Sequence, residues 1–173
     1  MRLKLLAVSL LLALMSSCTV TFLPNDDADI TVRTNVRYGI EVNDIIRVFE
    51  PTRGRGSTYF VGDGIAFTVL TREDGYITLT AIDPDGTVYV FARNIFVRGG
   101  QQTSISGTSE GSFQIAPPGG LQRVRASFTA SRVDTSRVTY RGVIGEDGWT
   151  QRIVADIRPY SVRDIAETRF FIQ

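Results

Sequence analysis

Carboxylates gather at two places in this chain where they could ligate a cation. Asp83 and Asp85 stand in an Asp-Pro-Asp-Gly run, with Asp74 close before them, and carboxylate oxygens are ligands that calcium prefers. A calcium loop, however, carries more oxygen ligands at regular offsets and ends in a bidentate glutamate. Proline and glycine in this spacing favour a tight turn, which we expect here. Residues 25–27 and Asp29 are also polar and acidic, but ordering a mobile segment costs entropy, so we expect a solvated spacer.

An Arg-Gly-Arg-Gly-Ser run at residues 53–57 has the residue types to hold a phosphate or a sulfated glycan. It matches neither a P-loop nor a dinucleotide fingerprint, and no helix follows it to supply a dipole. We therefore expect a flexible connection between two strands.

Several aromatic residues could form a platform on which sugar rings stack. They are Tyr89, Phe91, Phe96, Trp149 and Tyr160. Aromatic side chains of a sandwich usually fill the space between its sheets, and alternation places Tyr89 and Phe91 on one face of a strand. We expect core positions for most of them, with Trp149 the one best placed for an exposed loop because it follows Asp147-Gly148.

The amino-acid composition excludes several common classes of catalytic and metal-binding site. The chain has one cysteine and no histidine, and its only lysine is Lys4, so histidine triads, imidazole metal ligands and an intramolecular disulfide are excluded. Serine motifs of the G-x-S-x-G or S-x-x-K type are missing. Glu50, Glu110 and Glu167 could serve as glycosidase carboxylates, but nothing in their sequence surroundings distinguishes them from surface acids. No catalytic residue, cofactor or metal is assigned, and the sequence leans away from an enzyme.

The first 17 residues predict a signal peptide. Arg2 and Lys4 precede an apolar run of about eleven residues, which suits a secretory h-region and is too short to span a bilayer. The Met-Ser-Ser-Cys sequence that ends at Cys18 resembles the lipobox of bacterial lipoproteins. That resemblance implies acylation of Cys18 and a membrane anchor. Thr19 is not the aspartate that retains some lipoproteins in the inner membrane, so the outer membrane is favoured.

Residues 18–31 predict a flexible tether, because proline and an Asn-Asp-Asp run disfavour both helix and strand. Removal of residues 1–17 takes Lys+Arg from 19 to 17 against 18 acidic residues, a net charge of −1. This balance gives no basic excess for nucleic acid, which we do not expect as a partner.

Residues 32–173 predict an all-β domain, a single antiparallel, immunoglobulin-like β-sandwich without a helix longer than two turns. Alternating, β-branched segments separated by turn signals mark the expected strands. They are one strand around residues 32–38 and further strands at 45–49, 65–71, 76–82, 87–92, 103–105, 112–115, 122–129, 138–143, 150–157 and 165–172. The Glu-Asp-Gly run at residues 73–75 is expected to make a hairpin between its neighbours.

Two turn sequences carry a resemblance to a known family. An Ile-Asp-Pro-Asp-Gly-Thr-Val run begins at Ile82, and an Ala-Pro-Pro-Gly-Gly run begins at Ala116. With the Tyr-Phe-Val-Gly-Asp run from Tyr59 and the Glu-Asp-Gly-Tyr turn, they make residues 59–132 similar to the bacterial domain of unknown function 4384. The family's Phe-Pro-Asn element is replaced here by Phe-Ala-Arg-Asn, without its proline. The resemblance implies a β-sandwich accessory domain of an exported protein and carries no established reaction.

Together these features predict an exported, lipid-anchored protein of the cell envelope. The expected role is that of a non-catalytic accessory or interaction subunit in a surface or outer-membrane protein complex. Two alternatives stay open. One is an extracytoplasmic metal-dependent or redox-protective enzyme, such as a superoxide-dismutase-like sandwich, which would need unusual ligands without histidine. The other is a glycan-binding module.

Overall fold

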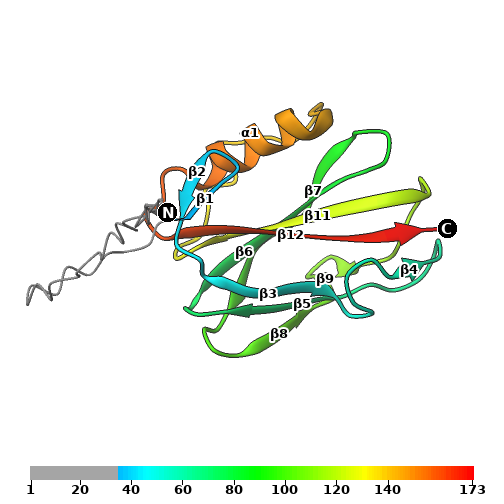
Figure 1. Ribbon diagram of the computed structural model, residues 1–173, viewed down its shortest axis with the longest axis horizontal. Helices are drawn as coiled ribbons and strands as arrows, with labels where there is room; N and C mark the ends of the chain where they lie inside the picture. The colour runs from blue at the N-terminus through cyan, green and yellow to red at the C-terminus, as the bar shows by residue number, and fades with distance from the viewer. Residues whose placement is uncertain (1–34) are drawn as a thin grey trace, which may run out of the picture. The chain divides into compact units, whose positions relative to one another are not determined.

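Alternating inward and outward side chains build two stacked sheets in the computed structural model, which describes residues 35–173 (Figure 1). The signal peptide, Cys18, the tether and the acidic residues 25–29 lie outside the described residues. The larger sheet has, in spatial order, β4 (Thr58–Tyr59), β12 (Arg163–Ile172), β11 (Gly120–Thr129), β6 (Gly75–Ile82) and β7 (Val88–Val97). The smaller sheet has β3 (Ile46–Pro51), β5 (Phe67–Thr71) and β8 (Gln102–Ile105).

Two short hairpins complete the strands. One is β1 (Asn35–Arg37) with β2 (Ile40–Val42), and the other is β9 (Gly107–Thr108) with β10 (Gly111–Ser112). The first hairpin replaces the single strand predicted around residues 32–38. Tyr38 and Gly39 both have positive φ angles, of 54° and 74°, which is the backbone of a tight two-residue turn.

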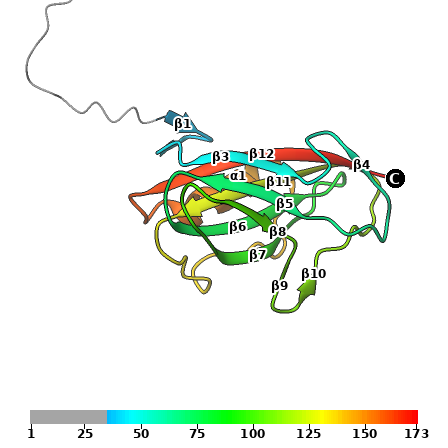
Figure 2. The same cartoon turned by 90° about the horizontal axis from the view of Figure 1, so that it is seen from below.

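The prediction of an all-β sandwich is confirmed. The faces of the two sheets that look toward each other bury a continuous apolar cluster, which includes Phe67, Val69, Leu79, Phe128 and Phe170. The smaller sheet is stacked over the larger one in Figure 2. Among the strands of residues 35–173, all pairs are antiparallel except β4 with β12, which run parallel.

The expected hairpin at residues 73–75 is wrong. The strands on either side of this turn belong to different sheets, β5 to the smaller and β6 to the larger. The turn therefore crosses from one sheet to the other. The Asp74 Oδ1 atom accepts a hydrogen bond of 2.8 Å from the backbone N–H of Gly99, and this bond ties the turn to the end of β7. The Asp-Pro-Asp-Gly turn does join two paired strands, β6 and β7, with Ile82 opposite Val88.

The expected strand at residues 150–157 is also wrong, because this segment lies in the helix α1 (Gly145–Ile157). Buried residues recur there at helical spacing, with Trp149, Ile153 and Ile157 on one side. Glycine and β-branched residues give the segment poor intrinsic helix propensity, which packing overrides. The expected strand at residues 138–143 is irregular chain that leads into the helix.

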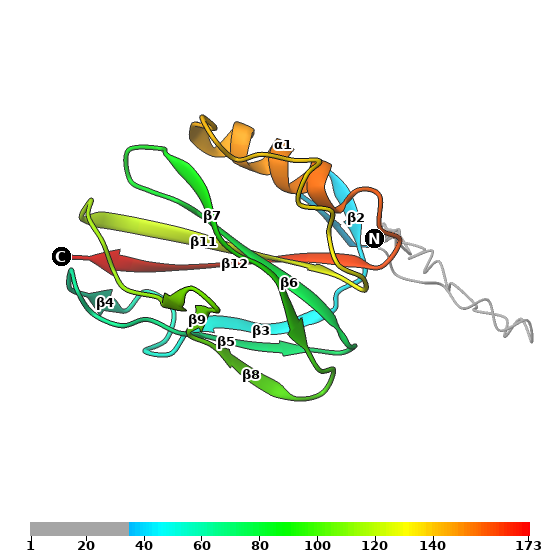
Figure 3. The same ribbon diagram turned by 180° about the vertical axis from the view of Figure 1, so that it is seen from behind.

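The helix forms a third layer. It lies on the face of the larger sheet opposite the smaller sheet (Figures 1 and 3). A second apolar cluster fills this layer and includes Val42, Ile82, Trp149, Ile153 and Ile165. Within residues 35–173 no helix has the length and apolar character needed to cross a membrane.

Candidate functional site

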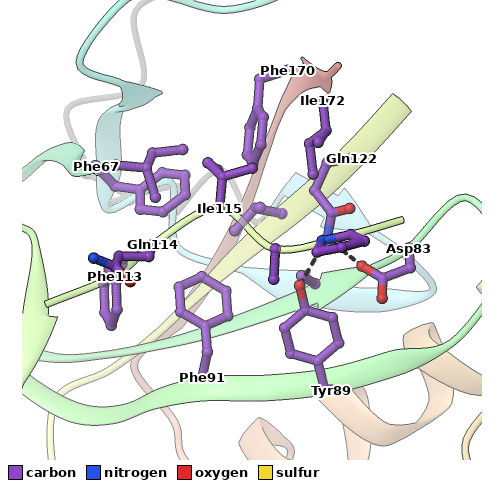
Figure 4. Close-up of a pocket in the computed structure, with 15 residues that line it drawn as sticks. Phe67, Asp83, Tyr89, Phe91, Phe113, Gln114, Ile115, Gln122, Phe170 and Ile172 are labelled. Carbon is purple, nitrogen blue, oxygen red and sulfur yellow. Dashed lines mark hydrogen bonds between the residues drawn. The ribbon is translucent and has the colours of Figure 1, made fainter. Parts of the chain in front are cut away.

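A cavity of about 350 Å³ opens at one end of the sandwich, between the inner face of the larger sheet and the segment that follows β10 (Figure 4). We call it the inter-sheet cavity. Strands β5, β6, β11 and β12 supply its buried walls, and β7 adds the partly exposed Tyr89 and Phe91. Exposed residues of the 113–117 segment form its rim. Its lining consists of Ile65, Phe67, Ala81, Asp83, Tyr89, Phe91, Phe113, Gln114, Ile115, Ala116, Pro117, Gln122, Val124, Phe170 and Ile172.

The apolar wall of this cavity contains four phenylalanine rings. The rings of Phe91 and Phe113 meet edge to face, with centroids 5.1 Å apart. Phe67 lies 5.9 Å from Phe91 and 6.4 Å from Phe170. These separations are those at which aromatic pairs attract one another through their quadrupoles. The wall therefore suits a further aromatic ring.

The other end of the cavity is polar. The Gln122 Nε2 atom donates hydrogen bonds to the Asp83 Oδ1 atom at 2.7 Å and to the Tyr89 hydroxyl oxygen at 3.0 Å (Figure 4). Gln122 is only 2% exposed, and its Oε1 atom is buried without a hydrogen-bond partner. A buried carbonyl oxygen is normally paired, and this atom has no partner among residues 35–173. It is enclosed by the protein and is not open to the cavity.

The phenol in this cluster is held in its neutral form. Burial raises the pKa of Tyr89 well above its usual range, and the neighbouring Asp83 carboxylate raises it further. Tyr89 therefore stays protonated at physiological pH. The cluster offers fixed hydrogen bonds rather than a group ready to exchange a proton.

The Asp-Pro-Asp-Gly turn explains why Asp83 faces the cavity. The backbone N–H of Gly86 donates to the Asp83 carbonyl oxygen at 2.9 Å, which closes the turn. Asp85 is used inside the turn, where its Oδ1 atom accepts from the backbone N–H of Thr87 at 2.8 Å, and this bond lowers its pKa. The turn expectation thus holds for Asp85, while the side chain of Asp83 is left to bind Gln122.

The two turn sequences of the family resemblance meet at this site, since Asp83 comes from one and Ala116 and Pro117 come from the other. Residues 58–132 match the family model of a domain of unknown function, DUF4384. The match agrees with the resemblance found over residues 59–132. It contains every residue of the cavity lining except Phe170 and Ile172, which β12 adds. No curated protein and no solved structure matches the chain.

The acidic residues first considered for calcium are not brought together. Asp74 precedes β6 and Asp83 follows it, so the length of that strand separates them. Within residues 35–173 no group of three or more potential metal-ligating side chains occurs.

The Arg-Gly-Arg-Gly-Ser run connects β3 and β4 and is fastened to the domain. The Arg53 guanidinium pairs with Asp63 at 2.7 Å and lies 4.5 Å from the ring centre of Tyr59. The backbone N–H of Gly56 donates to the Arg169 carbonyl oxygen at 2.8 Å. This run is a tied connection rather than a free anion loop.

The aromatic residues considered for glycan stacking do not share one surface. Tyr89 and Phe91 face the cavity with ring centres 6.2 Å apart, as their alternation predicts. Phe96 is half exposed and packs on Tyr76. The expectation that Trp149 lies on an exposed loop is wrong, because it belongs to the buried face of α1 and its Nε1 atom donates to the Thr80 hydroxyl at 2.8 Å.

Glu167 differs from Glu50 and Glu110, which are both exposed. Its carboxylate binds Arg123 at 3.0 Å and Arg125 at 2.8 Å. Burial raises the pKa of Glu167, but hydrogen bonds from the two arginines outweigh this effect and leave its pKa lowered. Glu167 therefore belongs to a structural ion cluster on the helix side of the larger sheet.

Arg125 is the centre of that cluster and is completely buried. Its guanidinium lies 3.9 Å from the Trp149 ring centre and 4.1 Å from the Tyr38 ring centre, and it binds Glu146 of the helix at 2.9 Å. Arg125 lies on the face of β11 opposite Val124 and Ala126, and α1 covers that face.

Gln122 is the site residue that sequence reasoning missed. It precedes Val124, Ala126 and Phe128 on the inward-facing positions of β11, which are otherwise apolar. A polar residue at an inward position is the signal that could have identified it, because burying an amide requires hydrogen-bond partners.

Proposed function

We propose that this chain is an exported, lipid-anchored protein of the cell envelope whose β-sandwich is a non-catalytic accessory or interaction subunit. The leader, the lipobox-like Met-Ser-Ser-Cys sequence and the polar residues 18–31 support export and anchoring through Cys18. In this proposal the inter-sheet cavity is the place where the domain binds its partner in a surface or outer-membrane assembly.

The polar end of the cavity carries the proposal. Gln122 donates hydrogen bonds to both Asp83 and Tyr89, and partial burial and the neighbouring carboxylate raise the pKa of the phenol, which stays neutral. These groups can orient a bound molecule, whereas a general acid or base needs a pKa near the working pH. The apolar wall supplies contact area, and its exposed rim gives access. A binding role therefore fits the geometry better than a catalytic one.

Site-specific crosslinking in intact cells tests this role. Gln114 at the rim is replaced by a photoreactive phenylalanine, and Gln151, an exposed residue of α1, receives the same replacement as the control. We expect one envelope protein to be captured in stoichiometric amount from position 114 and not from position 151. Equal capture at both positions, or no protein adduct at position 114, would count against an interaction subunit that uses this cavity.

The anchor is tested separately with Cys18→Ala. We expect an uncleaved precursor that incorporates no radiolabelled fatty acid, because Cys18 is the only cysteine of the chain. Continued acylation of this variant would overturn the lipoprotein proposal.

A further inference from the structure

Four exposed apolar side chains gather at the end of the larger sheet that α1 leaves uncovered. On the helix side of β12, Ile165 is buried in the cluster beneath α1, whereas Phe171 at the other end of the strand is exposed. Phe171 stands opposite Leu121 of β11, which is also exposed. Phe60 and Val61 are exposed too, and they follow β4, which pairs with the same end of β12 (Figure 1). We call Phe60, Val61, Leu121 and Phe171 the end patch.

The turn that carries Phe60 and Val61 is held in place by hydrogen bonds. The Asp63 Oδ2 atom accepts one from the backbone N–H of Phe60 at 3.1 Å and one from the Arg53 guanidinium at 2.7 Å. The backbone N–H of Val61 donates to the Gln173 carbonyl oxygen at 3.2 Å. An apolar side chain on a fixed turn loses little freedom when a partner covers it, so this display favours binding.

The charges beside the end patch are positive. Arg169 precedes Phe171 by two residues and therefore lies on the same face of β12. Arg55 lies close to it in the chain fold, because the residue after Arg55 donates its backbone N–H to the Arg169 carbonyl oxygen at 2.8 Å. Both arginines are exposed, and neither makes an ion pair within residues 35–173. The neighbouring carboxylates of Asp63 and Glu167 are already bound to other arginines.

This combination of apolar and positive groups discriminates between possible occupants. A two-fold interface with a second copy of the chain would join the patch to itself and bring Arg55 and Arg169 against the same arginines. A lipid bilayer is disfavoured because Leu121 and Phe171 stand on the broad face of a sheet rather than on a projecting tip. A protein surface with acidic side chains complements both the shape and the charge.

We propose that the end patch docks a segment of a partner protein in which acidic side chains lie beside apolar ones. The apolar side chains cover the end patch, and the carboxylates pair with Arg55 and Arg169, whose planar guanidinium groups favour bidentate bonding. The patch adjoins the inter-sheet cavity, because the backbone N–H of Gly62 donates to the carbonyl oxygen of Ile115 in the cavity lining at 2.9 Å. This docking site rests on the interaction role proposed above and adds the surface and the chemistry of the partner.

Photocrosslinking in intact cells tests the surface and the chemistry together. Phe171 is replaced by a photoreactive phenylalanine in the full-length chain, and mass spectrometry identifies the peptide to which it becomes attached. We expect the envelope protein that position 114 captures, joined through a segment in which aspartate or glutamate lies beside apolar residues. An adduct to a second copy of this chain, to a phospholipid or to a segment without acidic residues overturns the docking site, as does the absence of any adduct.

Charge reversal tests the two arginines. Arg55→Glu combined with Arg169→Glu should lower the yield of the adduct at least about tenfold, because like charges then face each other. Arg141→Glu combined with Arg152→Glu is the matched control, since it makes the same change in net charge at exposed arginines. It should leave the yield unchanged. Equal yields from the two double variants would contradict the role of Arg55 and Arg169.

A charge exchange and a milder variant complete the test. Lysine in place of the acidic residues of the captured segment should restore the adduct to the variant with glutamate at positions 55 and 169. Failure to restore it would contradict direct pairing. Should the charge-reversed variant fail to fold, alanine at both positions removes the charges without repulsion and should still lower the yield.

The two crosslinking positions separate the docking site from the interaction role on which it rests. A partner captured from position 114 but not from position 171 leaves the interaction role standing and removes the end patch from it. A partner captured from position 171 alone keeps the end patch and removes the inter-sheet cavity. No protein adduct from either position rejects the interaction role itself.

Discussion

Gly120 lies directly against the ring of Pro84. A β-carbon built on Gly120 would come 2.9 Å from the Pro84 Cγ atom and 3.2 Å from its Cβ atom. This contact joins the Asp-Pro-Asp-Gly turn at the end of β6 to the proline-glycine run that opens β11. Because β6 and β11 pair side by side, with Ile82 opposite Arg123, the two turns meet at one end of the larger sheet beside the inter-sheet cavity.

Gly120→Ala should therefore destabilise the domain. The φ angle of Gly120 is +125°, which a residue with a β-carbon rarely adopts, and the new methyl group would press on Pro84. Strain of this kind costs roughly 1–3 kcal/mol, to be measured as the change in free energy of unfolding in urea. Gly119→Ala, which has no positive φ, should lose less. If Pro84→Ala restores none of the loss in the double variant, the ring contact is not part of the cause.

This region shows what the sequence could and could not predict. Proline and glycine identified both turns, since their backbone preferences are local. Which turns would meet depends on the order of strands in the sheet, and that order is set by pairings between segments far apart in the chain. The same limit explains the mistaken hairpin at residues 73–75, where a good local turn signal joins two strands of different sheets.

Replacing the two aspartates of the Asp-Pro-Asp-Gly turn should have unequal effects. Asp85→Ala removes one solvent-exposed hydrogen bond with the backbone N–H of Thr87 and should lower the stability only slightly. Asp83→Ala removes the acceptor of a buried amide and should cost roughly 1–3 kcal/mol. Thermal unfolding of both variants and of the unsubstituted protein should not change with EDTA. A large fall in the melting temperature of the unsubstituted protein on adding EDTA would show a metal site instead.

Removing the buried guanidinium should be among the most damaging substitutions. Arg125→Ala leaves Glu167 without one of its partners and opens a space between the rings of Trp149 and Tyr38. Breaking a buried ion pair from one side costs roughly 3–5 kcal/mol. Arg125→Lys should recover little of this, because an ammonium group cannot stack flat between two rings. The emission of Trp149, the only tryptophan, should shift to longer wavelength, and an unchanged spectrum in Arg125→Ala would contradict the stacking.

The helix side of the sheet could be predicted less well than the cavity side. Inward positions of β11 and β12 follow strict alternation, so Val124, Phe170 and Ile172 were identifiable as core. On the outer face, the burial of Arg125 depends on α1, whose own sequence has weak helix propensity and reads equally as a short strand. Because residues 150–157 were predicted as a strand and not as part of a helix, Trp149 was predicted on an exposed loop instead of in the core.

Protonation of the Glu146 carboxylate should lower the stability of the folded protein in acid. Hydrogen bonds from Arg123 lower the pKa of Glu146 to about 2, from an ordinary value of 4.5. A carboxyl group with a lowered pKa stabilises the folded state above its unfolded pKa and loses this contribution as pH falls through its folded pKa. The melting temperatures of the unsubstituted protein and of Glu146→Gln should therefore differ at pH 7 and converge between about pH 4.5 and pH 2. The difference should be modest, because the Glu146 side chain is half exposed. A difference that grows in acid would contradict this assignment.

The end of β12 should be required for folding. Phe170 and Ile172 are 3% and 7% exposed and belong to the cluster between the sheets, where the Phe170 ring meets the Tyr59 ring edge to face at 5.3 Å. Burial of each such side chain contributes roughly 1.5–3 kcal/mol. A typical domain has a total stability of about 5–15 kcal/mol. Deleting residues 170–173 should therefore unfold the protein rather than shorten a loose end.

Two point substitutions separate burial from mere position on the strand. Phe170→Ala should cost roughly 3–5 kcal/mol, as buried phenylalanine truncations do. Phe171→Ala, next to it but 44% exposed, should cost well under half of that, and both are measured by urea unfolding of the full-length chain.

The competing view treats this strand as a free edge that waits for a partner chain. The pairing of Phe171 with Thr58 and Ile172 with Tyr59 argues against it, because β4 already occupies that edge. A truncated protein that keeps its full melting temperature but loses the crosslink from position 114 would decide for the free edge.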